Sequence, residues 1–467
     1  MEDIDIFNKE LLKHPKFFSY LKKNNQLENF KNIQNSKIEF KSNNLSAIYG
    51  PNGSGKTAII EAIEVVREYF LIDKPDFMEK ELDEKLKNFI KIGETTTSIE
   101  LEIEGETKKY KIILNFSKDK FNNILPMEEK ILYKNADKKR ETYKKLISFK
   151  SYETQQIKLK KSESINIIEK ILKQQETSKL SINLENVNLN SYLGIIFSQI
   201  IENQKSENKI ELNDELENVL INFLEIENYL TKIFVITLEN QAITNLKIFL
   251  NMNIHLENSQ GTIPITLNQN NNFYSENIAE AIINTVKQIN GIFKAIIPDS
   301  ELVCEVEGER ITEKEKEKGI NLYVIKKGDK ISIKNESVGI QKIVSILSAL
   351  IYCIQDENAL VVIDELDAHI FEYLLAVILE QISKIAKGQL IFTAHNLSPM
   401  ERLKGENIIV TSLDEDKINY SYFKRISKTT NLRQKYIRSQ AIWSEDNINP
   451  LNISETEIAL YMRKLVK

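Results

Sequence analysis

The stretch Tyr49-Gly50-Pro51-Asn52-Gly53-Ser54-Gly55-Lys56-Thr57 contains the complete pattern G-x-x-x-x-G-K-S/T. Its glycines allow the backbone to curl so that N–H groups point inward at phosphate oxygens. In this pattern the lysine reaches the β- and γ-phosphates and acts in catalysis, and the hydroxyl that follows it holds Mg²⁺. We therefore expect a phosphate-binding loop formed by Gly50, Asn52, Gly53, Ser54, Gly55, Lys56 and Thr57.

The segments on either side of the loop support this interpretation. Leu45–Tyr49 predicts a short buried strand, and Thr57–Ile63 predicts a helix that begins at the loop. A helix N-terminus favours anions because its dipole and its first N–H groups point at the ligand. A chance glycine-rich turn would have no reason to lie between such a strand and such a helix. The predicted ligand is a nucleoside triphosphate, ATP, with Mg²⁺.

A second motif predicts the acidic half of the same site. Ala359–Ile363 is a continuous apolar run that ends in Asp364 and Glu365. A central parallel strand delivers such carboxylates to the carboxyl edge of a sheet, where the phosphate loop also lies. We expect Asp364 to belong to the Mg²⁺ shell and Glu365 to take a proton from the attacking water.

A further strand-like run, Gln389–Thr393, is followed by Ala394-His395-Asn396. This places His395 at the same predicted sheet edge, where it is a candidate sensor of the γ-phosphate. The other histidines, His14, His255 and His369, do not follow such a strand and are interpreted as structural.

The pattern of apolar and polar residues along the chain predicts three segments. Residues 1–161 and 321–467 are expected to form the two halves of a nucleotide-binding head, and 162–320 a mostly helical insertion lobe. Period-two alternation over Thr97–Glu104 and Lys109–Leu114 predicts an antiparallel hairpin, and thus a side sheet. A second hairpin is predicted at 321–333, whereas Phe7–Leu27 has helix-like spacing interrupted at Pro15.

Composition limits the class of protein. The chain has 467 residues, 42% hydrophobic and 28% charged, and no apolar run that approaches the roughly 18 residues of a membrane span. Its acidic start, Met1–Ile6, lacks the features of an export signal, so we expect a cytoplasmic protein without membrane contact. Cys304 and Cys353 are expected to be buried thiols.

Net charge gives no global reason to bind nucleic acid, because the chain carries a formal charge of −5. Any basic face must be local. The run from Lys134 to Lys161 is rich in lysine interleaved with tyrosine and phenylalanine. It is either a solvated face or a DNA contact, and the sequence leaves both alternatives open.

Four motifs occur in the order found in ABC-type ATPases: the phosphate loop, Ser337-Val338-Gly339-Ile340-Gln341, the Asp364-Glu365 pair with Asp367, and Thr393-Ala394-His395-Asn396. In these motifs the chain resembles the soluble branch of that group, the RecF, SMC and OLD-like ATP-binding proteins. That branch includes ATPase subunits of bacterial anti-phage systems such as Septu and PARIS. The resemblance covers about Asn32 to Ile72 and Asn321 to Asn431.

The resemblance implies an α/β head of the P-loop ABC type that hydrolyses ATP between two copies paired head to tail. Ser337 and Gly339 of one copy would contact the nucleotide of the other, and Asp367 would lie in the loop that crosses between them. Glu365 would be the hydrolytic base. The sequence departs from the Ser-Gly-Gly-Gln signature of transporters, and the glutamine loop is not identifiable, although Gln155 and Gln156 fall at a suitable place.

Two functions follow as expectations. The first is a sensor or motor ATPase of an anti-phage defence system, a homodimer or higher homo-oligomer that works with a separate effector protein. The second is a RecF- or SMC-like DNA-repair clamp that grips duplex DNA when it binds ATP. An energising subunit of a transporter is disfavoured, since no segment that could couple to a membrane component is visible.

Overall fold

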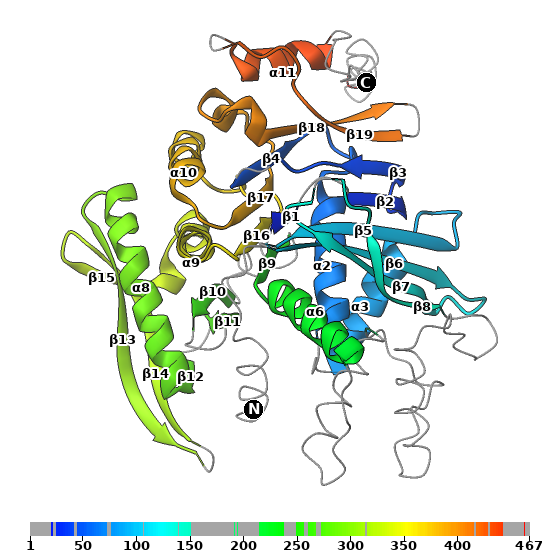
Figure 1. The fold of residues 1–467 in the computed structure, drawn as a ribbon. Coiled ribbons are helices and arrows are strands. Elements are labelled where there is room, and N and C mark those ends of the chain that lie inside the picture. The colour runs from blue at the N-terminus through cyan, green and yellow to red at the C-terminus, as the bar shows by residue number, and fades with distance from the viewer. Residues whose placement is uncertain are drawn as a thin grey trace.

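The computed structural model describes residues 20–21, 25–41, 44–71, 76–105, 107–138, 140–150, 191, 194, 214–237, 249–255, 260–267, 272–312, 315–414, 417–427, 430–441 and 462. Gln155, Gln156 and the greater part of 151–213 lie outside these residues. Figure 1 gives the labels of the elements used below.

The centre of the fold is a six-stranded sheet in the order β19-β18-β4-β17-β16-β9. All neighbouring pairs are parallel except β18 with the edge strand β19. Its members are β4 (Leu45–Tyr49), β9 (Ile233–Ile236), β16 (Leu360–Ile363), β17 (Gln389–Thr393), β18 (Ile408–Asp414) and β19 (Lys417–Tyr422). The phosphate loop, the Asp364-Glu365 pair and His395 therefore follow three adjacent strands at one edge.

Both faces of this sheet are covered. Along β16, Leu360 and Val362 pack in one hydrophobic cluster and Val361 and Ile363 in the other, which explains why the strand is apolar at every position. Figure 1 shows helices α2 (Lys56–Phe70), α3 (Asp76–Phe89) and α6 (Asp214–Thr231) on one side. Helices α8 (Glu276–Ile296), α9 (Val338–Gln355) and α10 (Glu372–Ile385) lie on the other.

An antiparallel side sheet stands beside the core, in the order β3-β2-β5-β6-β7-β8 with β1 paired to β5. Its strands are β1 (Tyr20–Leu21), β2 (Asn25–Phe30), β3 (Ile33–Ile38), β5 (Thr96–Glu104), β6 (Lys108–Lys118), β7 (Ile124–Asn135) and β8 (Lys144–Lys150). The predicted β5–β6 hairpin is confirmed. The helix-like spacing up to Leu27 is not: the described residues there are strands, because they complete this sheet.

A third sheet has the order β12-β14-β13, with β15 paired to β14, and a separate hairpin joins β10 to β11. These strands are β10 (Phe249–His255), β11 (Gln260–Thr266), β12 (Asn272–Ser275), β13 (Ser300–Ile311), β14 (Lys316–Lys326) and β15 (Asp329–Ser332). The predicted β14–β15 hairpin is confirmed.

The expectation of a mostly helical lobe over 162–320 differs from the structure. Its described residues include α6 and α8, but also β9 of the core sheet and strands β10 to β13. The missed signal is alternation: Leu250, Met252 and Ile254 are buried on one face of β10. The expected boundary at 320 also falls inside β14, so this lobe and the second half of the head share a strand.

The remaining elements are α11 (Leu432–Ala441) and the 3₁₀ turns η2 (Ile333–Asn335), η3 (Ser398–Glu401) and η4 (Gly405–Asn407). One described helix, α9, is long and apolar enough to cross a membrane by length and composition, contrary to the sequence expectation that no run approaches this length. It is 72% buried within the protein, so its apolar residues serve the core. Cys353 is buried within α9, and Cys304 is half-buried; both are free thiols.

Candidate nucleotide-binding site

The phosphate loop connects β4 to α2 and depends on its glycines in two ways. Gly53 and Gly55 have φ values of +76° and +82°, in the left-handed region that side chains disfavour. Gly50 is required by contact instead, since a Cβ there would lie 1.8 Å from the Thr411 Oγ1 atom of β18. No side chain caps α2, so the helix N-terminus presents its backbone N–H groups to the loop.

Lys56 is folded back into the loop. Its side chain is only 7% exposed, and Nζ donates to the carbonyl oxygens of Gly50 (2.9 Å) and Pro51 (3.0 Å). Burial lowers the pKa of Lys56, and the nearby Asp364 and Glu365 carboxylates oppose that shift. A cation held in this way, beside an uncapped helix N-terminus, suits a polyanionic ligand.

Thr57 and Asp364 meet at the same edge, as predicted from the sequence. Thr57 Oγ1 donates to Asp364 Oδ1 at 3.2 Å, and the Thr393 hydroxyl donates to the same carboxylate oxygen. Asp364 is 1% exposed. A hydroxyl and a carboxylate this close are hard oxygen ligands of the kind Mg²⁺ takes together with phosphate oxygens.

Glu365 adopts a strained backbone, with φ of +45°. Two contacts hold it: its N–H donates to Thr393 Oγ1 at 2.8 Å, and its carbonyl oxygen accepts from Lys342 Nζ at 3.1 Å. The side chain faces His395, whose Nε2 lies 3.8 Å from Glu365 Oε1. A strained backbone conformation persists only where the surrounding contacts hold it in place. Such residues are typical of functional sites.

Asp367 fixes the position of the histidine turn. Its Oδ2 accepts from the backbone N–H groups of His395 (2.9 Å) and Asn396 (2.6 Å). Within this chain, Asp367 therefore orients the segment that carries His395, and its own side chain does not line the nucleotide pocket.

Ser337 and Gly339 stand at the N-terminus of α9. Ser337 is exposed, and its Oγ accepts from the Ile340 N–H at 3.3 Å as the helix cap. Gly339 abuts the loop after β16, since a Cβ there would lie 2.9 Å from the His369 carbonyl oxygen. Neither residue lines the nucleotide pocket of its own chain.

A pocket of about 400 Å³ opens over the phosphate loop. It brings the loop together with the acidic strand end and the histidine turn, both of which lie more than 300 residues after it in the sequence. Its lining residues are Lys31, Asn32, Asn52, Gly53, Gly55, Lys56, Thr57, Ala58, Glu365 and His395.

The model of the AAA ATPase domain family matches residues 23–398 of this chain, and the match contains every part of the pocket. The chain belongs to the AAA ATPase domain family. No curated protein matches it.

Solved structures similar to this AAA ATPase domain include Smc heads. The Smc head of Pyrococcus furiosus, bound to the C-terminal domain of ScpA, has 13% identity over 91% of this chain and 100% of its own, with a TM-score of 0.42. The Smc head of Pyrococcus yayanosii has 12% identity over 90% and 99%, with a TM-score of 0.43. The SMC head of Thermotoga maritima has 13% identity over 87% and 99%, with a TM-score of 0.38.

The residues of this AAA ATPase domain fit a nucleotide with Mg²⁺. The loop supplies N–H groups and a buried cation, and Thr57 with Asp364 would supply two metal ligands. Among the described residues, no group of three or more His, Cys, Asp or Glu side chains could hold a metal alone. A metal here would thus depend on Thr57, Asp364 and phosphate oxygens together.

Sequence reasoning missed five residues of the site: Lys31, Asn32, Ala58, Thr393 and Lys342. Lys31 and Asn32 reach the pocket from the β2–β3 turn; Asn32 Nδ2 donates to the Gly53 carbonyl oxygen, and Lys31 Nζ pairs with Glu61 at 2.7 Å. The Thr393 hydroxyl contacts both Asp364 and Glu365, and Lys342 donates to the Glu365 carbonyl oxygen. The first pair carries no local signal, whereas Thr393 is the last residue of a predicted strand, so the sequence predicts its position but not its contacts.

Proposed function

We propose that this protein hydrolyses ATP at the pocket over the phosphate loop. The observation that carries the proposal is the convergence of Thr57, Asp364 and Glu365 on one edge, with the Thr393 hydroxyl in contact with both acidic positions. Membership of the ATPase domain family supports it.

Each residue has a separate task under this proposal. The loop N–H groups and Lys56 would bind the phosphates, and Thr57 with Asp364 would hold Mg²⁺, which supplies charge neutralisation when bound. Glu365 would accept a proton from water at Oε1 or Oε2. His395, with Nε2 3.8 Å from Glu365 Oε1, would orient that carboxylate and contact the terminal phosphate.

Pairing of two copies head to tail is part of the proposal. Ser337 is exposed at the N-terminus of α9 and is absent from its own pocket, so its hydroxyl is accessible to a second chain. The N–H groups at a helix start suit a phosphate there as they do at α2. Asp367, which anchors the His395 turn, lies in the loop that would pass between the two copies.

The biological setting rests on the sequence resemblance alone. We propose a sensor or motor ATPase of an anti-phage defence system, acting with a separate effector protein in the cytoplasm. The second candidate is a RecF- or SMC-like DNA-repair clamp, and it gains from the exposed basic residues around α11.

The test of hydrolysis is phosphate release from ATP and Mg²⁺ by wild type and Glu365→Gln. We expect about a 100-fold lower rate in the variant, since a positioned general base contributes at least that factor. Binding of a fluorescent ATP analogue should be retained. Glu372→Gln, which changes an exposed carboxylate at the start of α10, is the matched control and should keep the wild-type rate. Equal rates in wild type and Glu365→Gln would contradict the proposal.

A further inference from the structure

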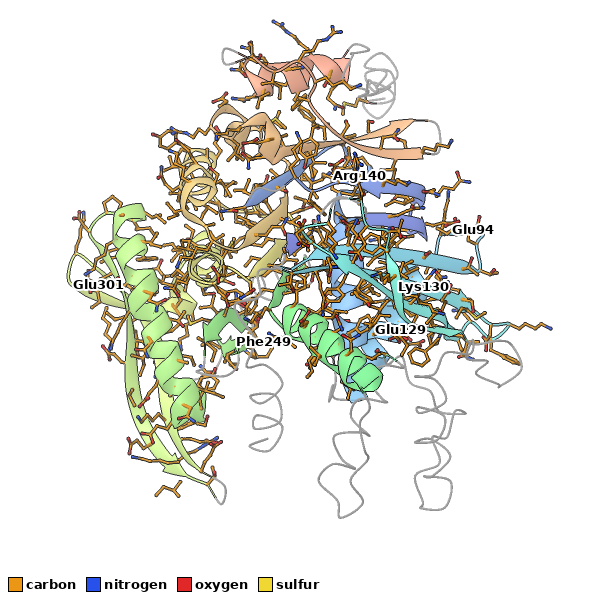
Figure 2. The ribbon with its side chains drawn as sticks, viewed as in Figure 1. Glu94, Glu129, Lys130, Arg140, Phe249 and Glu301 are labelled. Carbon is orange, nitrogen blue, oxygen red and sulfur yellow. The ribbon has the colours of Figure 1, made fainter. Side chains whose placement is uncertain are left out.

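Strand β19 lies in the seam between the core sheet and the side sheet. It pairs with β18 of the core sheet, and it lies against β3 of the side sheet. The Ser36 hydroxyl of β3 donates to the Ile418 carbonyl oxygen across this seam. In Figure 1, β19 runs beside β3, and in Figure 2 side chains occupy the space between the two strands. The phosphate loop leaves β4, the other neighbour of β18, so β19 can reach the loop from the seam.

The Tyr420 side chain of β19 contacts the end of the loop where α2 begins. Its hydroxyl donates to the Gly55 carbonyl oxygen at 2.6 Å, and the same oxygen accepts from the Ala58 N–H at 3.2 Å in the first turn of the helix. Gly55 has φ of +82°, and a Cβ there would lie 3.0 Å from the Tyr420 hydroxyl oxygen. Tyr420 and the helix together therefore hold the Gly55 carbonyl in one direction.

The direction of this carbonyl fixes the direction of the next N–H group. A trans peptide is planar, so the Gly55 C=O and the Lys56 N–H point in opposite directions. Gly55 and Lys56 line the nucleotide pocket, whereas Tyr420 does not. The Lys56 N–H therefore points away from Tyr420, as is required of a group that binds a phosphate oxygen in the pocket.

A second residue of the same hairpin contacts the other end of the loop. Thr411 of β18 is the cross-strand partner of Tyr420, and directly opposed side chains lie on one face of an antiparallel pair. The Thr411 hydroxyl donates to the Tyr49 carbonyl oxygen at 3.3 Å and contacts the Ser54 hydroxyl. A single cross-strand pair of β18 and β19 thus supports the loop where it leaves β4 and where it enters α2.

We propose that Tyr420 is a positioning residue for nucleotide binding, which holds the Gly55–Lys56 peptide so that the Lys56 N–H faces the phosphates shared by ADP and ATP. In a phosphate loop, the backbone N–H groups surround the α- and β-phosphates, which both nucleotides carry. Tyr420 acts on the nucleotide only through Gly55. Its role rests on the proposed binding of ATP at this pocket, but not on ATP hydrolysis.

Tyr422, two residues further along β19, provides the matched control. Its hydroxyl donates to the Glu39 carbonyl oxygen at 3.0 Å and accepts from the Lys41 N–H at 3.1 Å. It thus makes the same kind of contact with the backbone across the seam, but neither partner belongs to the phosphate loop. Loss of either tyrosine hydroxyl removes a contact of β19, whereas only loss of the Tyr420 hydroxyl should change nucleotide binding.

The test compares full-length wild type, Tyr420→Phe and Tyr422→Phe in titrations with fluorescent analogues of ATP and of ADP in the presence of Mg²⁺. We expect Tyr420→Phe to weaken binding about three- to tenfold, the factor that one net hydrogen bond contributes. Both analogues should be affected equally, because the phosphates concerned are common to them. Tyr422→Phe should bind both within about twofold of wild type. Thermal unfolding checks that each variant is folded.

Phosphate release separates this role from the proposed hydrolysis. A contact made equally in the ground state and the transition state changes KM alone, so Tyr420→Phe should raise KM by the same factor and keep kcat within about twofold. Unchanged affinity in Tyr420→Phe, or equal losses in the two variants, would overturn the proposal, as would a wild type that binds neither analogue. A wild type that binds both analogues but releases no phosphate contradicts the proposed hydrolysis and leaves the comparison of affinities standing.

Discussion

At the scale of single residues, one hydroxyl organises the acidic end of the pocket. Thr393 is fully buried; it donates to Asp364 Oδ1 and accepts from the Glu365 N–H, so it fixes a metal ligand and a strained backbone together. It touches no position expected for substrate and is therefore a positioning residue.

Thr393→Val should lower ATP turnover about 10- to 100-fold, because a buried N–H and a carboxylate are each left without this partner, at roughly 1–3 kcal/mol for each group. Thr393→Ser keeps the hydroxyl and should recover the greater part of the rate. Phosphate release at saturating ATP measures both. Equal defects in the Val and Ser variants would contradict this role of the hydroxyl, because the Ser variant keeps it.

Glu64 of α2 is a buried carboxyl group whose surroundings set its pKa and thereby affect the stability of the fold. It is 5% exposed, and burial raises its pKa to about 7 despite Lys85 at 3.2 Å. The folded protein thus takes up a proton that the unfolded chain binds only near pH 4.5. Stability from this group is present at low pH and is lost as the pH rises toward and through about 7.

Glu64→Gln should therefore stabilise the protein at about pH 8 by about 1–3 kcal/mol and change little at about pH 5. Denaturant unfolding at the two pH values measures the difference. Glu84→Gln, at a carboxylate that is 73% exposed on α3, is the control and should be neutral at both. A Glu64→Gln variant less stable than wild type at the higher pH would contradict this account of the carboxylate.

At the scale of elements, the phosphate loop is shaped by β18 as well as by its own sequence. A Cβ at Gly50 would meet Thr411 Oγ1 at 1.8 Å and Ser54 Oγ at 2.5 Å. The first position of the motif must therefore be glycine so that the loop can pack against β18, a strand more than 350 residues later in the chain.

Gly50→Ala should destabilise the protein by about 1–3 kcal/mol, as overpacking does, and weaken binding of a fluorescent ATP analogue. Adding Thr411→Ala removes the nearest atom and should restore part of both. Gly291→Ala in α8, where a Cβ meets nothing within 4 Å, is the control and should be neutral or stabilising. A Gly50→Ala protein with wild-type stability and binding would show that the loop does not depend on β18.

The predictable elements are those whose signal is local. The phosphate loop, β16 before Asp364 and β17 before His395 each combine an apolar run with a polar ending, and the structure places all three at one sheet edge. Strand β9 has only four residues, and its sheet position depends on pairing with β16 far later in the chain, which no local pattern encodes. Lys31 and Asn32 reach the pocket through the same kind of long-range packing.

At the scale of the whole molecule, the proposed head-to-tail pairing would leave one chain with only part of the nucleotide contacts, because Ser337 does not line the pocket of its own chain. Ser337→Arg should then leave the chain folded, at a cost of about 0.5–2 kcal/mol for the lost cap of α9, while lowering turnover at least about tenfold by blocking a second copy. Phosphate release measured over a range of protein concentrations should depend on concentration in the wild type and not in the variant. Wild-type turnover by Ser337→Arg would show that Ser337 plays no part in ATP hydrolysis.

Under the proposed mechanism, ATP held at the phosphate loop brings two copies of this chain together. The most direct test is the mass of Glu365→Gln in solution by light scattering, with and without ATP and Mg²⁺, beside Glu365→Gln/Ser337→Arg. We predict that the mass doubles from 54.1 kDa when ATP and Mg²⁺ are added, and that the second variant stays at the smaller mass. A mass of Glu365→Gln that does not respond to ATP, in a protein that binds the nucleotide, would contradict the claim.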